Sequence, residues 1–284
     1  MTDTSAFTIP DARGLPGIQA ALRVTVALQC WGLGAMKLLD AGNSAFVQMR
    51  AMGKHVDPSS LAWLDQATGG FLLAAGLLAL TRPIWPLLFV VCVAFAAEAF
   101  APVGMSVGWH GWVLMATWGG AIVAPVALLL IDWFPPKARF SLARFLIAIT
   151  MVRYGVAIAA LALGLQAVYE SRHAGTLAEH LQRVAESAAG RTLSDDALGW
   201  SLALIGAVCL AMGLNVLASR AWGVMAMLGV WGLLLAATHL VASGAYGVAE
   251  FLSRFAWAGL PVALALYWSR SVEDRGDVLR TRDG

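Results

Sequence analysis

Eight long apolar stretches dominate this sequence and decide what it can fold into. Each is close to the roughly 20 apolar residues that a helix needs to cross the hydrocarbon core of a bilayer. None alternates between polar and apolar residues as the strands of membrane barrels do. Only 13% of the residues are charged, against about 25% in soluble domains. The sequence therefore predicts an all-α, polytopic membrane protein with eight transmembrane helices, at approximately residues 17–39, 61–81, 83–103, 109–131, 143–167, 198–217, 221–242 and 251–268.

The positively charged residues are unevenly distributed between the two sides of the predicted membrane. Ten Lys and Arg residues fall on the side that holds both termini and seven on the other. Because Lys and Arg in short loops favour the cytoplasm, we expect a bacterial-type inner (plasma) membrane protein with both termini cytoplasmic. The bilayer is then its first partner, and a net charge of +2 gives no reason to expect nucleic acid. The loops expected outside are 40–60, 104–108, 168–197 and 243–249.

The two halves of the chain resemble each other when one is shifted by about 130 residues. Arg23 precedes Gly34 by eleven residues, and Arg153 precedes Gly164 by the same interval. Because each half holds an even number of spans, both insert with the same orientation, which makes the repeat parallel. The predicted organisation is a polar N-terminal segment, two four-helix modules and a polar C-terminal tail, at residues 1–14, 15–133, 142–268 and 269–284.

The connection between the first and second spans is long in both halves. The second connection contains TLAEHLQRVAESAAG, where Thr176 and Glu179 fit a capping box and Gly190 is a predicted helix stop. The first contains NSAFVQMRAMG at 43–53, with apolar residues near one face. Either segment can lie on the outer membrane surface as a lid. The first can instead serve only as a solvated connector.

The stretch RVTVALQCWGLGAMKLLD at 23–40 resembles the opening of the DoxX family, with an early arginine and a G-x-x-K near the helix end. Asp65, which precedes several glycines in the second span, fits the same family and is expected to pair with Lys37. The second half resembles a degenerate copy that lacks the lysine and the acidic residue. The resemblance implies a four-helix membrane module associated with redox enzymes, including the small subunit of thiosulfate:quinone oxidoreductase. Other relatives look like assembly or trafficking factors.

Four ionisable residues share one predicted depth, near the outer side. Glu98 and His239 lie at the outer ends of the third and seventh spans, and His110 and Glu250 at the outer starts of the spans that follow. Ionisable groups inside a bilayer are costly and usually face a partner or water. These four are therefore the predicted catalytic cluster, with one carboxylate and one imidazole on each hairpin.

Several chemistries fit such a cluster. A histidine beside a carboxylate can relay protons near neutral pH, so a quinone is the leading predicted cofactor. Two imidazoles and two carboxylates also suit a first-row metal ion with His110 and His239 as ligands, and the same histidines can hold a haem. In a purely structural interpretation, each Glu–His pair only fastens its own hairpin.

Three arginines are predicted to contact a cofactor or anion. Arg254 follows Glu250 by one helical turn, where it can form a local ion pair or neutralise a bound anion. Arg23 and Arg153 occupy equivalent positions in the two halves. They either extend to the inner surface or hold carboxylates or lipid phosphates there.

The leading hypothesis is an integral membrane subunit of a quinone-linked redox complex, which requires other protein subunits or a redox partner. The alternatives are a non-enzymatic membrane scaffold or assembly factor, and a metal-handling or transport protein. Four tryptophans lie deep within predicted spans, where they either fill space or form an aromatic wall for a quinone ring: Trp31, Trp118, Trp231 and Trp257.

Overall fold

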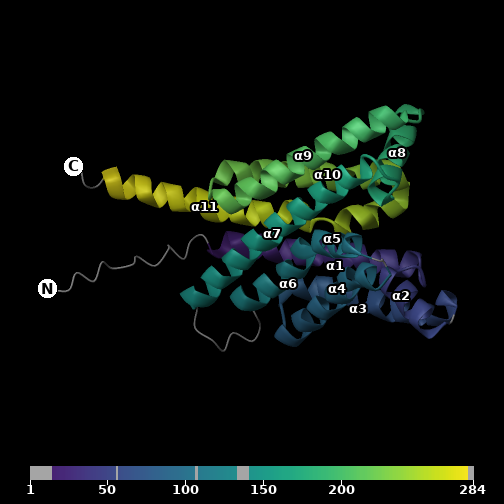
Figure 1. Ribbon diagram of the computed structural model, residues 1–284. Coiled ribbons are helices and arrows are strands. Elements are labelled where there is room, and N and C mark those ends of the chain that lie inside the picture. The colour runs from purple at the N-terminus through teal and green to yellow at the C-terminus, as the bar shows by residue number, and fades with distance from the viewer. Residues whose placement is uncertain (1–14, 56, 106–107, 133–140, 281–284) are drawn as a thin grey trace.

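The computed structural model describes residues 15–280 except 56, 106–107 and 133–140, and it describes residues 270–280 by their backbone alone. The described residues form helices joined by short connections (Figure 1), which confirms the all-α prediction. The predicted polar segment at 1–14 lies outside the described residues. The helices are α1 (Leu15–Leu39), α2 (Ala45–Lys54), η1 (Pro58–Leu61), α3 (Ala62–Thr81), α4 (Trp85–Met105), α5 (Trp109–Thr117), α6 (Gly119–Ile131), α7 (Leu142–Glu170), α8 (Thr176–Ala189), α9 (Asp195–Ala218), α10 (Trp222–Ser253) and α11 (Ala256–Arg280).

Several of these helices are long and apolar enough to cross a membrane. Within the described part of the chain, five segments pass this test by length and composition, and α5 with α6 makes a sixth if this pair, bent by 45°, is one span. This is the pattern of a multi-pass membrane protein. The five segments are Pro58–Thr81, Trp85–Met105, Leu142–Glu170, Asp195–Ala218 and Trp222–Ser269.

Two helix pairs, α1 with α3 and α7 with α9, cross in the same way. A Cβ added to Gly34 on α1 would lie 2.9 Å from the carbonyl oxygen of Gly69 on α3. On the second pair, a Cβ at Gly164 would lie 3.0 Å from the carbonyl oxygen of Gly206. Small residues allow such close backbone approach between membrane helices. Both crossings therefore depend on glycine at both contact positions.

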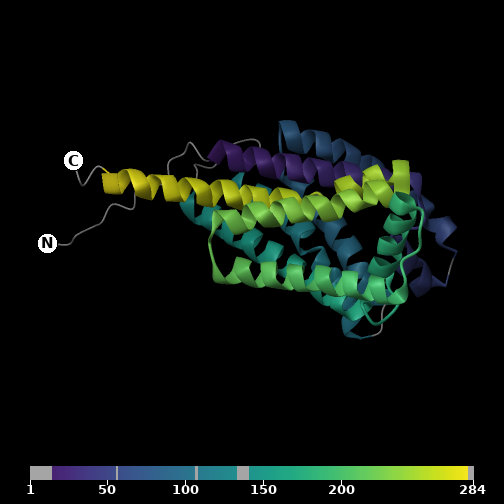
Figure 2. The ribbon, with the colours of Figure 1, turned by 90° about the horizontal axis from the view of Figure 1, so that it is seen from above.

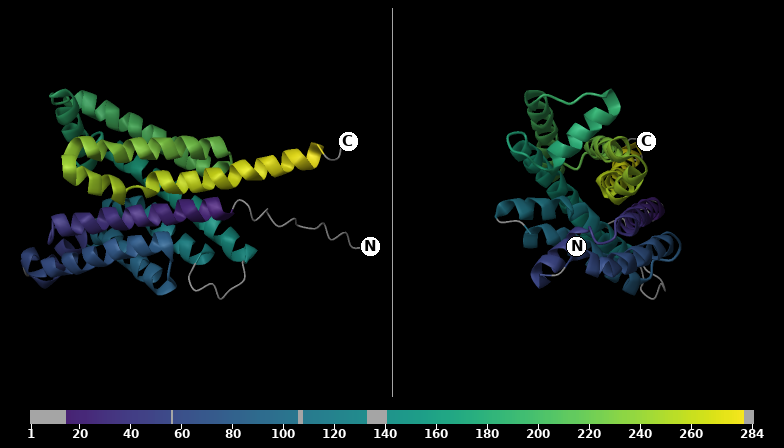
Figure 3. Two further views of the ribbon diagram at one scale, coloured as in Figure 1. Left: turned by 180° about the vertical axis from the view of Figure 1, so that it is seen from behind. Right: turned by 90° about the vertical axis from the view of Figure 1, so that its right-hand side faces the viewer.

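Each of these pairs packs on the opposite half of the chain. α1 lies against α10 and α11, and α7 lies against α5 and α6. Figure 3 shows α1, in purple, beside α11, in yellow. A Cβ at Gly32 on α1 would lie 2.6 Å from the carbonyl oxygen of Ala249 on α10, so this contact is also backbone to backbone. The two halves are interlocked and share one hydrophobic core.

The helix α10 reverses direction at Gly244. Its backbone there has φ 55° and ψ −126°, a left-handed conformation that glycine tolerates. In a continuous helix, residues 239 and 250 would be about 16 Å apart, yet their side chains are in hydrogen-bond contact. The returning part of α10 leads into α11, as Figure 2 shows.

The predicted bounds of the last span and of the C-terminal tail differ from the observed helix bounds. The stretch expected to be one span at 251–268 begins in the returning arm of α10, is interrupted at Arg254 and Phe255, and continues as α11. The helix then runs on to Arg280, so most of the predicted tail at 269–284 is a continuation of α11. Residues 281–284 lie outside the described residues.

Candidate functional site

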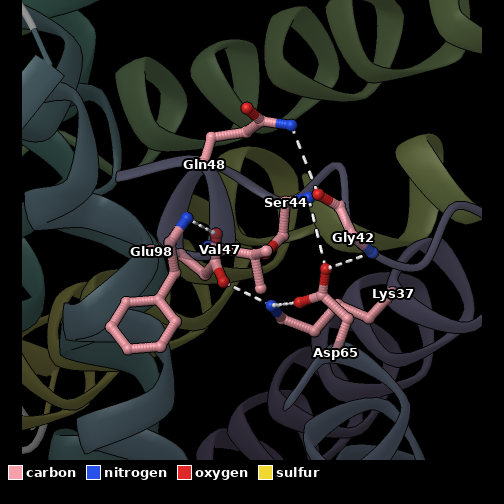
Figure 4. Close-up of polar contacts among 8 residues, drawn as sticks. Lys37, Gly42, Ser44, Val47, Gln48, Asp65 and Glu98 are labelled. Carbon is pink, nitrogen blue, oxygen red and sulfur yellow. Dashed lines mark hydrogen bonds and ion pairs between the residues drawn. The ribbon is translucent and has the colours of Figure 1, made fainter. Parts of the chain in front are cut away.

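A buried ion cluster joins the C-terminal end of α1, the N-terminal part of α3 and the C-terminal part of α4. Lys37 Nζ donates to Asp65 Oδ1 at 2.7 Å and also to Glu98 Oε1. All three residues are at most 4% exposed. The predicted Lys37–Asp65 pair is therefore confirmed, with Glu98 as a third member (Figure 4).

Backbone amides of the first connection complete this cluster. Asp65 Oδ2 accepts from Gly42 N at 2.9 Å and from Ser44 N at 3.3 Å, and Glu98 Oε2 accepts from Phe46 N at 3.3 Å. Both carboxylates thus hold the start of α2 against the bundle, because their oxygens satisfy amides that precede or begin that helix. Glu98 bonds with Lys37 and Phe46, and its expected pairing with His110 is not among its contacts.

His110 lies in a different setting, at the start of α5. Its ring is 5.5 Å from that of Tyr169 near the end of α7 and 6.2 Å from that of Trp109. Its Nδ1 atom is buried and has no hydrogen-bond partner in the described structure. The neighbours of this ring come from α5 and α7, whereas those of His239 come from α8 and α10.

His239 on α10 is held between a carboxylate and a guanidinium. Its Nδ1 lies 3.0 Å from Glu250 Oε2, and its Nε2 lies 2.9 Å from Arg254 Nη1. Ser243 also donates to Glu250 Oε2, at 3.1 Å. The expected direct Glu250–Arg254 contact is replaced by this arrangement, in which the imidazole lies between the two charged side chains.

The chemistry of these partners determines the protonation of His239. A guanidinium is only a donor, so Nε2 must accept and carries no proton. The imidazole proton is then on Nδ1, where it is donated to the Glu250 carboxylate. A proton added at Nε2 would face the N–H groups of Arg254, so this arrangement favours the neutral form of His239.

A second histidine, on α8, covers this group. The rings of His180 and His239 stack with centroids 4.0 Å apart and planes at 28°. Thr238 donates its hydroxyl to Leu235 O, so it accepts from His180 Nε2, at 2.8 Å. Burial, together with the nearby Arg254, lowers the pKa of His180 to about 4. The sequence interpretation missed His180, although it lies on the apolar face of the predicted amphipathic helix.

Glu170, at the end of α7, was also missed and is what caps α8. Its Oε2 accepts from Leu177 N at 2.7 Å and Ala178 N at 3.0 Å, the orphan amides of the first turn. The predicted capping box is wrong, because the N-cap residue is Gly175 and Thr176 is already inside the helix. The predicted stop is confirmed, since Gly190 ends α8 with φ 63°.

The paired arginines bind groups of the protein itself at the other end of the bundle. Arg23 Nε donates to Asp132 Oδ2 at 2.6 Å, and Arg153 Nε donates to Val216 O at 2.8 Å. Arg23 also reaches the carbonyl oxygen of Leu80, and Arg153 reaches that of Leu217, at the ends of α3 and α9. Both arginines therefore satisfy carbonyl groups at the C-terminus of a neighbouring helix.

An apolar pocket lies between α7 and α10, and residues of α6, α9 and α11 complete its lining. Trp231 and Trp257 line it, two of the four tryptophans expected to lie deep in the membrane. The indole N–H of Trp231 donates to Cys209 Sγ at 3.4 Å, and the guanidinium of Arg254 lies 5.5 Å from the Trp257 ring centroid. The pocket is thus linked through Trp257 to the group around His239.

Among the described side chains, no group of three or more His, Cys, Asp and Glu residues could hold a metal ion. Comparisons with protein-family models, with curated proteins and with solved structures find no match to this chain.

Proposed function

We propose that this protein is an eight-span membrane subunit of a quinone-linked redox complex, built from two DoxX-like repeats. In this proposal the group formed by His239, Glu250 and Arg254 passes protons between the outer side and a bound quinone. Electrons come from a partner redox subunit. Reduction of a quinone to a quinol consumes two electrons and two protons, which end on its two oxygens.

Matched contacts in the two halves support the repeat. Gly69 and Gly206 are separated by 137 residues, and so are Leu80 and Leu217. Each glycine closes the equivalent helix crossing and each leucine carbonyl accepts from the equivalent arginine. Two unrelated four-helix segments would have no reason to share both contacts at one offset.

The redox proposal rests on the position of the His239 imidazole between Glu250 and Arg254. Its Nδ1 proton is already donated to Glu250, and its Nε2 lone pair is bound only to Arg254 Nη1. If a ligand oxygen drew the Arg254 guanidinium away, Nε2 would be freed to exchange a proton with that oxygen. Arg254 would then balance negative charge on the ligand.

This proposal uses only part of the predicted cluster. Glu98 has a structural role, because it bonds to Lys37 and anchors the start of α2. His110 has its own neighbours on α5 and α7. The proposed proton route therefore runs through the second half alone, and the ion cluster of the first half has a structural role.

The test is the quinone content and activity of the purified full-length chain with any co-purifying subunits. We expect an organic extract to contain ubiquinone or menaquinone, and quinone reduction to fall when His239→Gln or Glu250→Gln is introduced. His173→Gln is the matched control, because His173 is exposed and stacks only on Tyr169. A quinone-free extract, or full activity in both site variants, would refute the proposal, and a quinone-free protein with a stoichiometric partner would favour the assembly-factor alternative.

A further inference from the structure

We infer that the pocket between α7 and α10 receives a short segment of one apolar chain of a membrane amphiphile, whose polar head lies against Arg254. The inference rests on the membrane function proposed above. It specifies which part of the bound ligand lies in the pocket. A chain-bearing quinone and a phospholipid or fatty acid share this chemistry.

The lining explains why the occupant is apolar. It consists of glycine, alanine, branched aliphatic, proline and tryptophan residues with one thiol, and that thiol already accepts from Trp231. Water needs several polar partners to remain in a cavity, so this lining excludes it. The lining residues are Gly120, Val156, Ala159, Ala160, Leu163, Cys209, Leu228, Trp231, Gly232, Leu235, Ala256, Trp257 and Pro261.

The size of the pocket favours a chain over a fused ring system. The cavity measures about 40 Å³, which is the space of roughly three water molecules at about 10–15 Å³ each. Only a segment of an alkyl or isoprenoid chain, on the order of three or four carbons, fits this space. The small side chains at Gly120, Ala159 and Ala160 are what keep it open.

The position of the pocket places the head of such a molecule. The pocket residues from α7, Val156 to Leu163, lie near the middle of that helix, and Leu235 lies one turn before His239 on α10. Trp257 lines the pocket, and the guanidinium of Arg254 lies over its ring. A chain in the pocket therefore continues toward Arg254, whose guanidinium has five N–H donors, enough for both His239 and a head-group oxygen.

The experiment fills the pocket and measures chain binding directly. The full-length protein is reconstituted in phosphatidylcholine vesicles that contain either a diazirine-chain phosphatidylcholine or a diazirine-chain benzoquinone, and cross-linked peptides are mapped after illumination. In the wild-type protein we expect labelling concentrated on α7 and α10. Ala160→Phe should reduce this labelling at least about tenfold, a loss of roughly 1.4 kcal/mol in binding.

The control is Ala74→Phe, at an exposed position of α3 that does not line the pocket. It should leave the labelling of α7 and α10 unchanged. Labelling spread evenly over all membrane-facing helices, or unchanged by Ala160→Phe, would overturn the inference.

Cys209 gives a second readout that does not depend on cross-linking. In a Cys30→Ala/Cys92→Ala background, Cys209 is the only thiol, and a membrane-permeable maleimide should modify it slowly while the pocket is occupied. Stripping bound lipid with detergent should speed the modification, and adding back the chain-bearing molecule should slow it again. A modification rate that changes with neither treatment would count against an occupied pocket.

The two proposals can fail separately. Assays of the organic extract for quinone absorbance, lipid phosphorus and fatty acid identify the source of the chain. A phospholipid displaced by Ala160→Phe, with no quinone in the extract, would support the pocket inference and refute the quinone proposal. Quinone that stays bound and reducible in Ala160→Phe would do the reverse.

Discussion

The imidazole of His180 on α8 stacks on the imidazole of His239 on α10, with ring centroids 4.0 Å apart. The contact fastens the amphipathic helix between the fifth and sixth predicted spans to the group proposed to handle protons. Both rings are buried, and the neighbouring Arg254 and Arg183 make a proton on His180 unfavourable, which Glu250 only partly offsets. Docking of α8 is therefore coupled to pH.

Acidification should release α8. The pKa of His180 is about 4 when docked and returns to about 6.5 when exposed. The detached helix therefore binds a proton that the docked helix does not, and docking weakens as pH falls from about 6.5 toward 4, with no change above that window. Hydrogen exchange of the α8 amides at pH 7.5 and 5 measures this. His180→Gln should flatten the pH dependence, while the exposed His173→Gln should keep it.

Removing Lys37 should destabilise the protein more than removing the whole ion cluster. Lys37→Met leaves Asp65 and Glu98 buried without a counter-ion, a change that typically costs about 3–5 kcal/mol. The triple variant Lys37→Met/Asp65→Asn/Glu98→Gln carries no buried charge there and should recover part of this loss. Thermal unfolding in detergent compares the two, and equal stability would show that the charges do not interact as described.

The glycine crossings should tolerate no added methyl group. Gly34→Ala places a Cβ 2.9 Å from a carbonyl oxygen, and Gly164→Ala places one at 3.0 Å. Each should cost about 1–3 kcal/mol, as overpacking does. Gly70→Ala, with nothing within 4 Å, is the control on α3 and should not destabilise. Equal melting temperatures for all three variants would contradict the tight crossings.

The cap of α8 should depend on Glu170 and not on Glu179. Glu170→Gln weakens two hydrogen bonds to first-turn amides, and loss of a cap costs about 0.5–2 kcal/mol. Glu179→Gln changes only an exposed side chain. Exchange rates at the amides of Leu177 and Ala178 should rise in the first variant alone, and a rise in the second would restore the capping-box interpretation.

Local patterns predicted the helices well, because each depends on residues close in sequence. Apolar stretches placed the helices of the bundle, and Gly190 marked the end of α8. Lys37 and Asp65 are 28 residues apart, and their pairing was predicted because they lie at adjoining ends of the first two spans. The sequence predicted only a loop at 243–249. A single glycine does not reveal that the chain reverses at Gly244 while the residues on both sides of it remain helical. The start of the last helix was misplaced for the same reason.

The candidate site was predicted less well, because its partners depend on tertiary packing. The four residues Glu98, His110, His239 and Glu250 were grouped by their depth along the helices. Depth does not specify the direction of a side chain around the helix axis. Glu98 therefore turned toward Lys37, and only His239 and Glu250 came together, because the turn at Gly244 brings two parts of one helix side by side.

The interlocked packing of the two halves has a consequence for biogenesis. α1 and α3 leave the ribosome well before α10 and α11, the helices that cover the opposite side of α1. During synthesis, the face of α1 that packs on α10 and α11 must contact lipid or the translocation machinery until these two helices have been made. Splitting the gene between the halves should therefore yield two fragments that are degraded when expressed singly and survive when expressed together.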